Sequence, residues 1–236
     1  MPDAEDIDVW LVRPDRVKDP ALLARYRALL THDEATRLAA FRAEKHRHEY
    51  LLTRALVRAT LSRYRPVAPA AWRFAKNEFG RPTIDPPCGV WFNLSNCVSL
   101  VVCAVSRVRE VGVDVEPLAR AEEVREVQST VFSDAELADL RALDRTKEAD
   151  RLVSLWTLKE AYIKARGIGM SAPLRQITLR FGPMGAARLE LAPSVGDDAS
   201  PWWFHTFDVD GHRVALASAA GSAGAVVHVA ETTPLA

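Results

Sequence analysis

Apolar residues that alternate with polar ones, or run together in short stretches, divide the chain into a series of predicted strands. These segments are residues 7–12, 72–77, 90–94, 99–105, 111–115, 174–181, 202–209 and 213–219. Asp210-Gly211 lies between the last two segments and predicts a tight hairpin. The short polar segment between 99–105 and 111–115 predicts a second antiparallel hairpin. Residues 226–229 are expected to add an edge strand, and the tail from Glu231 is expected to be loose.

Apolar residues spaced three and four apart predict helices over residues 20–30, 31–64, 133–143 and 147–166. Two of these begin with a capping box, Thr31-His-Asp-Glu34 and Ser133-Asp-Ala-Glu136, in which the first and last side chains bond each other's backbone N–H. Gly167 follows the longest helix and is expected to end it.

The order of elements repeats along the chain, because a capping box, a helix and then strands occur twice. This order predicts an α+β fold of two similar subdomains, each with a small antiparallel sheet packed against helices. We expect the subdomains to cover residues 1–112 and 113–236, with residues 119–125 as the covalent link between them.

Composition restricts the possible partners. The chain of 236 residues has a formal net charge of zero, so nucleic acid is an unexpected partner. No segment is apolar enough over about 18 residues to predict a membrane span. The three cysteines match no metal-ligand spacing and no disulfide pattern, and the start of the chain lacks a signal sequence. We therefore expect reduced thiols in a cytoplasmic protein.

Basic residues concentrate between Arg37 and Arg65, a segment with eight Lys or Arg and only two acidic residues, Glu44 and Glu49. A helix of this charge could line a phosphate-rich ligand, could bind an acidic partner protein, or could simply be solvated. The charge pattern alone does not choose among these three.

Three carboxylates and a lysine stand out among the remaining polar residues. Asp114 and Glu116 are two apart in a predicted strand, so they share a face of it, and Glu160 and Lys164 share a face of a predicted helix. Each pair taken singly is typical of a solvated surface. Carboxylates at the end of a buried strand are costly unless paired or coordinated, so together the pairs favour a Mg²⁺ site for a phosphate-bearing substrate.

Four motifs resemble those of one enzyme family. They are Gly-Val-Asp-Val-Glu at 112–116, Trp-x-x-Lys-Glu-Ala-x-x-Lys-x-x-Gly at 156–167, Gly80-Arg81-Pro82, and Phe92-Asn93-Leu94-Ser95. In order and spacing they resemble the Sfp-type 4′-phosphopantetheinyl transferases, over roughly residues 30 to 185. Such enzymes move the phosphopantetheine arm of coenzyme A to a serine of a carrier protein.

The resemblance implies a monomeric pseudo-dimer with its active site between the two subdomains, acting on an acyl or peptidyl carrier protein and releasing 3′,5′-ADP. Asp114, Glu116 and Glu160 would hold Mg²⁺. Glu160, directly or through water, is the candidate base, and Lys164 would neutralise phosphate charge. The expected coenzyme A contacts are Arg81, Ser95, Asn96, Arg47, His48 and Arg37.

Some positions depart from the family pattern or keep other functions open. Asn96 stands where many relatives have a histidine that donates to a coenzyme A phosphate, so affinity for the 3′-phosphate is expected to be weaker. Glu34 also lies where a basic residue would help. Trp156 is expected to orient its helix, and Lys159 to face away from Glu160. A phosphohydrolase and a non-catalytic binding module remain as alternatives to the transferase.

Overall fold

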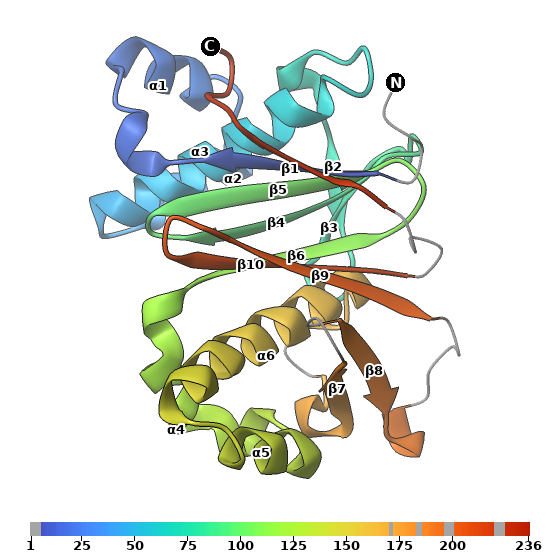
Figure 1. Cartoon of the computed structure of the whole chain (residues 1–236). Coiled ribbons are helices and arrows are strands. Elements are labelled where there is room, and N and C mark those ends of the chain that lie inside the picture. Colours follow the sequence, from blue (N-terminus) through green and yellow to red (C-terminus); the bar gives the residue numbers. More distant parts are fainter. Residues whose placement is uncertain (1–5, 170–171, 183–185, 196–200, 220–224) are drawn as a thin grey trace. The chain divides into compact units, whose positions relative to one another are not determined.

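The computed structural model describes residues 6–169, 172–182, 186–195, 201–219 and 225–236, which form two compact units (Figure 1). The first unit contains residues up to 77, 82–108 and 225–236, and the second contains 78–81 and 109–224. The predicted boundary after residue 112 therefore differs from the observed division at 108/109. The last segment of the chain also returns to the first unit.

A four-stranded sheet with the order β11-β1-β5-β4 organises the first unit. Its strands are β1 (Ile7–Val12), β4 (Trp91–Cys97), β5 (Leu100–Ser106) and β11 (Val227–Glu231). All neighbours are antiparallel except β1 and β11, which are parallel. A separate hairpin pairs β2 (Phe74–Lys76) with β3 (Pro82–Ile84).

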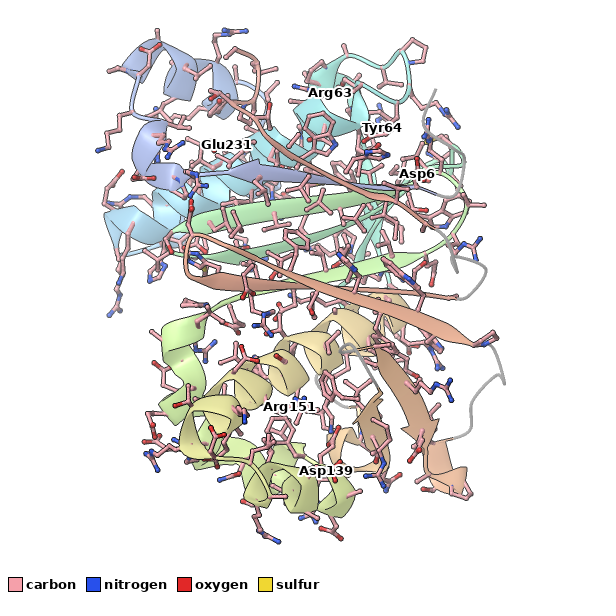
Figure 2. The ribbon with its side chains drawn as sticks, in the orientation of Figure 1. Asp6, Arg63, Tyr64, Asp139, Arg151 and Glu231 are labelled. Carbon is pink, nitrogen blue, oxygen red and sulfur yellow. The ribbon has the colours of Figure 1, made fainter. Side chains whose placement is uncertain are left out.

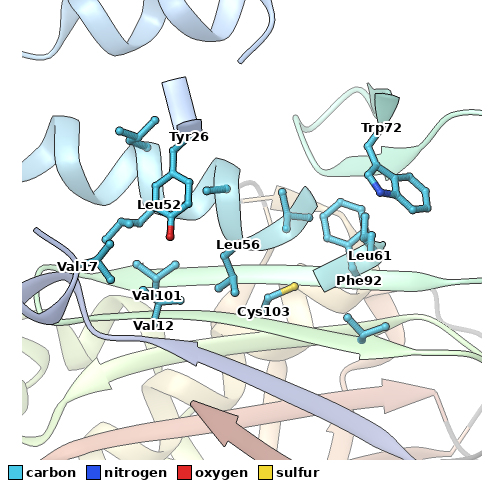
Figure 3. Packing of buried hydrophobic residues seen from close by; sticks show 14 of the residues in the cluster. Val12, Val17, Tyr26, Leu52, Leu56, Leu61, Trp72, Phe92, Val101 and Cys103 are labelled. Atoms are coloured by element: carbon cyan, nitrogen blue, oxygen red, sulfur yellow. The ribbon is translucent and has the colours of Figure 1, made fainter. Parts of the chain in front are cut away.

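The helices of the first unit are α1 (Pro20–Arg27), α2 (His32–Ala40) and α3 (Glu44–Leu61). Helix α3 buries Leu52, Leu56 and Leu61 against apolar side chains of the sheet such as Val101 and Cys103 (Figure 3). Each of these side chains has lost nearly all its contact with water, so this helix and sheet form the core of the unit.

The second unit contains a three-stranded antiparallel sheet with the order β6-β10-β9 and a two-stranded sheet, β7-β8. Its strands are β6 (Val111–Pro117), β7 (Ile177–Phe181), β8 (Ala187–Leu191), β9 (Trp202–Val209) and β10 (His212–Ala219). Its helices are α4 (Ala121–Val131), α5 (Asp134–Arg141) and α6 (Arg145–Arg166). Side chains at the edge of this unit include Asp139, which accepts from Arg180, and Arg151, which lies over the Phe181 ring (Figure 2).

Several predictions are confirmed. The fold is α+β, and each unit packs a mainly antiparallel sheet against a long helix. Both capping boxes are formed, at Thr31/Glu34 and at Ser133/Glu136. Gly167 ends α6 in the left-handed conformation with φ 64°, and positive φ at Asp210 and Gly211 forms the β9-β10 hairpin.

The predicted hairpin between 99–105 and 111–115 is wrong. Strand β5 already has β1 on one side and β4 on the other, so its backbone hydrogen bonds are used within the first sheet. Strand β6 pairs with β10 in the second sheet instead. The short polar segment that suggested a turn is the place where the chain passes from one unit to the other.

The predicted link at residues 119–125 is also wrong, because these residues lie inside the second unit, in a 3₁₀ turn (Leu118–Arg120) and the start of α4. The predicted helix over 31–64 is broken at residues 41–43, where Arg47 Nη1 donates to the Phe41 carbonyl at 2.6 Å. No glycine or proline marks this break in the sequence. Strands β3 and β8 were not predicted.

The C-terminal tail is fixed, contrary to the expectation that it would be loose. Glu231 accepts hydrogen bonds from Arg13 and Arg16, at 3.0 and 2.8 Å (Figure 2). The Tyr26 hydroxyl donates to the Pro234 carbonyl at 2.5 Å. Within the described residues, no helix combines the length and the apolar character that a membrane span requires.

Candidate active site

Two of the predicted metal-binding carboxylates lie on β6, where this strand packs closely against α6. Gly112, Asp114 and Glu116 alternate along β6 and therefore share one face of the sheet. A Cβ atom on Gly112 would lie 2.0 Å from the Ala161 carbonyl oxygen and 2.5 Å from the Ala165 nitrogen, both in the backbone of α6. The glycine of the motif thus allows the helix to lie directly on this face, beside the two acidic residues.

Asp114 and Lys164 form an ion pair between the strand and the helix. The Asp114 side chain is buried, and Oδ1 lies 2.6 Å from Lys164 Nζ. The lysine side chain is 29% exposed, so it is only partly withdrawn from solvent. The predicted metal ligand and the predicted catalytic cation are therefore in direct contact.

Glu116 is held by two donors on different elements. Its Oε1 accepts from Trp156 Nε1 at 3.0 Å and from Arg120 Nη1 at 2.6 Å. Trp156, which was expected to orient the helix, thus also holds Glu116, one of the predicted metal ligands. Arg120 was not predicted as part of the site, although its position four residues after Glu116, with acidic residues on either side, is a usable signal.

Glu160 lies one helical turn before Lys164 on α6. In the part of the chain that the structure describes, its Oε1 is buried and has no hydrogen-bond partner. Burial raises the pKa of Glu160 above its ordinary value. The Asp114 charge raises this pKa further, the Lys164 charge opposes that effect, and the Glu116 charge adds a smaller increase. The Glu160 carboxyl group is therefore influenced by the charges of both acidic residues of β6.

The side chains of this group differ in how well they suit a divalent cation. Among the described residues, no group of three or more His, Cys, Asp or Glu side chains is already arranged around a metal position. Lys164 bonds Asp114, and Arg120 and Trp156 bond Glu116, so these carboxylates are directed toward protein donors. The donor chemistry nevertheless fits Mg²⁺, which prefers carboxylate oxygens. The unpartnered Glu160 oxygen is the kind of buried acceptor that a cation would satisfy.

Lys159 points away from this group, as its position on the helix predicted. It is 1% exposed and lies 2.6 Å from Glu136 Oε2, and it also donates to the carbonyls of Val131 and Leu174, each at 3.0 Å. Glu136 in turn caps α5 and accepts from the Leu179 N–H at 2.8 Å. The lysine of the motif therefore joins α4, α5, α6 and β7 in the core of the second unit.

Arg81, an expected coenzyme A contact, belongs to the second unit. Its Nη1 donates to the Ala165 carbonyl in the last turn of α6 at 2.6 Å and lies 3.2 Å from Glu110 Oε2. The guanidinium group is therefore already bonded to the helix that carries Glu160 and Lys164.

Ser95 and Asn96, the expected contacts from the first unit, are adjacent on β4 but face different environments. Ser95 is buried, whereas Asn96 is exposed. The Asn96 side-chain amide donates to Oε1 of Glu49, a buried residue of α3. His46 Nδ1 lies 3.6 Å from the other oxygen of the same carboxylate. The contact between Glu49 and Asn96 was not predicted, because the sequence pattern identifies Glu49 only as a charge.

The three expected contacts from the basic helices also have protein partners. Arg47 donates to Glu44 at 2.8 Å and to the Phe41 carbonyl, and His48 Nε2 lies 2.8 Å from the Pro14 carbonyl oxygen. Arg37 is exposed, with its guanidinium carbon 5.7 Å from the centre of the Tyr50 ring. Of these three, Arg37 is the residue whose charge is most accessible to a ligand.

Comparison with known proteins gives consistent matches. Residues 110–217 match the family model ACPS, described as the 4′-phosphopantetheinyl transferase superfamily. The chain is 30% identical over 199 residues to 4′-phosphopantetheinyl transferase Sfp of Bacillus subtilis, with 83% of this chain and 84% of that protein covered. It is 29% identical over 194 residues to 4′-phosphopantetheinyl transferase HetI of a Nostoc species, with 81% of each covered.

Among solved structures, the chain matches a holo-(acyl-carrier-protein) synthase from Bacillus anthracis in complex with CoA (3′,5′-ADP). The TM-score is 0.40 and the identity 19%, with 47% of this chain and 94% of that chain covered.

Proposed function

The chain belongs to the Sfp-type 4′-phosphopantetheinyl transferase family, and from this membership we propose that it transfers the 4′-phosphopantetheine arm of coenzyme A to a serine of an acyl or peptidyl carrier protein. The reaction would depend on Mg²⁺ and release 3′,5′-ADP. The observation that carries the proposal is the close contact of β6 with α6 at Gly112, where the Asp114–Lys164 ion pair and the hydrogen bond from Trp156 to Glu116 join the two acidic residues of the strand to the helix that carries Glu160.

The proposed reaction forms a bond between the serine oxygen and the β-phosphorus and breaks the bond from that phosphorus to the bridging oxygen. Asp114, Glu116 and Glu160 would hold Mg²⁺, which when bound supplies positive charge to the pyrophosphate. Glu160 is the candidate acceptor of the serine proton, because its raised pKa gives it more affinity for a proton than an exposed carboxylate has.

Lys164 and the residues around Glu116 have separate proposed roles. The Lys164 ammonium group would stabilise negative charge that develops on the leaving phosphate, because its partly exposed side chain can contact both Asp114 and a ligand. Trp156 and Arg120 would keep Glu116 in position through their hydrogen bonds.

We propose the nucleotide contacts in two groups. Arg81 donates to the carbonyl of Ala165, the residue after Lys164 on α6, and would contribute from the second unit. Ser95, Asn96, Arg47, His48 and Arg37 would contribute from the first unit. The location of the active site between the two units stays a prediction.

We also propose that the protein works as a monomer in the cytoplasm. Cys88, Cys97 and Cys103 are free thiols, and Cys103 is fully buried, as expected where disulfides do not form. Light scattering coupled to size-exclusion chromatography tests the monomer directly, and a dimer mass would contradict it.

The transfer itself can be tested with intact-mass spectrometry. The protein is incubated with coenzyme A, Mg²⁺ and a set of apo acyl and peptidyl carrier proteins, and we expect a phosphopantetheine adduct on at least one carrier together with 3′,5′-ADP. Phosphopantetheine and 3′,5′-ADP without an adduct would indicate a hydrolase instead. Binding of coenzyme A without either product would indicate a non-catalytic module.

A further inference from the structure

Arg213 on β10 is a buried arginine that lies outside the four family motifs. Its side chain is only 9% exposed, and Nη2 lies 2.6 Å from Asp150 Oδ1 on α6. Nη1 donates to Ser154 Oγ on the same helix, one turn further along. Nε and Nη2 also donate to the two carboxylate oxygens of Asp208 on β9. One guanidinium group therefore joins β10, β9 and α6.

The position of Arg213 in the sheet brings it next to the candidate site. In the antiparallel pairing of β6 with β10, Arg213 is the direct partner of Glu116, so both side chains leave the same face of the sheet. This is the face on which α6 lies, because Gly112 shares it and approaches the helix backbone. Glu116 contacts α6 at Trp156. Arg213 contacts the helix two residues earlier, at Ser154.

Helix α6 thus meets the sheet at two separate points. The first is the hydrogen bond from Arg213 to Ser154. The second is the close approach of Gly112 to Ala161. Ser154 and Ala161 are seven residues apart, so they share a face of the helix and lie about 10 Å apart along its axis. A helix that is held at two such points can neither pivot on the sheet nor turn about its axis.

Trp156 and Glu160 lie between these two points, so their positions depend on the rotation of α6. Apolar side chains such as Leu155 and Leu158 bury the helix in the core of the second unit, but hydrophobic contact has no preferred direction. Charge-assisted hydrogen bonds, such as those of Arg213, fix a direction as well as a distance. A rotation of α6 would move the Glu160 carboxyl group away from the acidic residues of β6.

On the basis of the proposed function, we propose that Arg213 is a positioning residue of the transferase, whose bonds to Asp150 and Ser154 set the rotation of α6 and hold Glu160 beside the acidic residues of β6. Arg213 acts through the helix, without contact to the substrate or the cation. Its loss should therefore lower kcat and the affinity for the cation, and leave KM for coenzyme A nearly unchanged.

Replacing Arg213 by methionine tests this role. Methionine keeps much of the apolar stem, and Asp150 and Asp208 are 59% and 49% exposed, so water can solvate both carboxylates in the variant. With one apo carrier protein and saturating Mg²⁺, kcat should fall by at least about tenfold, because a displacement of about 1 Å among catalytic groups costs roughly 100-fold. KM for coenzyme A should change by less than about threefold. Electron paramagnetic resonance with coenzyme A present should show Mn²⁺ affinity lowered by at least about threefold.

The double variant Asp150→Ala/Ser154→Ala breaks the same link from the helix side. It leaves Arg213 paired with Asp208, so the buried cation keeps a partner. The loss in kcat should match that of Arg213→Met, and combining all three substitutions should add little, because effects that act through one link are not additive. If Arg213→Met does not fold, this double variant provides the test.

Arg175→Met is the matched control. Arg175 donates to the Ser129 carbonyl on α4 and to Asp134 on α5, at 2.9 and 2.5 Å, so these bonds join elements other than α6 and the three-stranded sheet. The substitution removes the same charge from the same unit. Its kcat and its Mn²⁺ affinity should equal those of the unmodified protein.

The result that overturns the proposal is a kcat within about threefold of that of the unmodified protein in the variants that fold. A loss between about threefold and tenfold supports the proposal if Mn²⁺ affinity also falls and overturns it if that affinity is unchanged. A loss that appears only in KM for coenzyme A also overturns it, because Arg213 would then contact the substrate. If the unmodified protein modifies no carrier, the proposed function fails and the role of Arg213 with it, whereas transfer that Arg213→Met leaves intact overturns only this inference.

Discussion

Replacing Gly112 by alanine tests whether the contact between β6 and α6 determines the geometry of the site. The added Cβ would lie 2.0 Å from the Ala161 carbonyl oxygen, 2.5 Å from the Ala165 nitrogen and 2.9 Å from the Ala165 Cβ. Ordinary van der Waals contact begins near 3.4 Å, so strand and helix must separate by about 1.4 Å at this point. The obstructing atoms belong to helical backbone, which cannot rotate away as a flexible side chain would.

Two effects should follow from this separation. Overpacking of a close-packed interior costs about 1–3 kcal/mol, so we expect the free energy of unfolding to fall by at least that amount. Asp114 on β6 and Glu160 on α6 would also move apart, and a displacement of about 1 Å among catalytic groups costs roughly 100-fold in rate. Gly112 has no positive φ, so backbone strain would not contribute to either effect.

Urea denaturation and the rate of carrier modification measure these two effects. Gly182→Ala is the control, because its Cβ would meet its nearest neighbour at 3.5 Å, an ordinary contact. Adding Ala165→Gly to Gly112→Ala removes only the 2.9 Å contact and should restore little. If the Gly112→Ala variant keeps the stability and the transfer rate of the unmodified protein, the close approach of β6 and α6 is refuted.

Three further predictions concern charged or ionisable groups. Glu160→Gln should lower transfer by at least about 100-fold while thermal unfolding shows an intact fold, and retained turnover would exclude Glu160 as base and ligand. Lys159→Met should lower the free energy of unfolding by about 3–5 kcal/mol, because the Glu136 carboxylate is left buried without its cation. Adding Glu136→Gln should recover part of this loss. A single Lys159→Met variant as stable as the unmodified protein would contradict the importance of the buried pair. Burial raises the pKa of Tyr26 to about 12, so the contribution of its neutral hydroxyl to stability is complete below pH 10 and is lost as the pH rises toward 12. Between pH 9 and 11 the Tyr26→Phe variant should therefore lose about 1 kcal/mol less of its free energy of unfolding than the unmodified protein loses. Urea titrations measure the two losses, and equal losses would contradict the prediction.

The elements with strong local signals were predictable from the sequence. The local sequence predicts the capping boxes, the helix end at Gly167 and the turn at Asp210-Gly211, because each depends on hydrogen bonds or backbone angles within a few residues. The parallel pairing of β1 with β11 and the pairing of β6 with β10 join segments far apart in the chain, and no local pattern encodes them. For the same reason the short polar segment between β5 and β6 was mistaken for a turn.

The acidic pair and the helix were likewise predictable as separate groups, because residues two apart share a strand face and residues four apart share a helix face. Their meeting depends on Gly112, which the motif contains but whose contact with Ala161 only the structure reveals. The hydrogen bond of Glu49 with Asn96 could not be predicted, because it joins residues 47 positions apart.

Binding of Mn²⁺ in place of Mg²⁺, followed by electron paramagnetic resonance, tests the central claim that β6 and α6 supply one cation site. With coenzyme A present, the unmodified protein should bind one Mn²⁺ per chain. Asp114→Asn and Glu160→Gln should each weaken that binding by at least about tenfold, since each removes one carboxylate from the ligand set. Equal affinity in the unmodified protein and both variants would contradict the account, because the cation would then bind elsewhere.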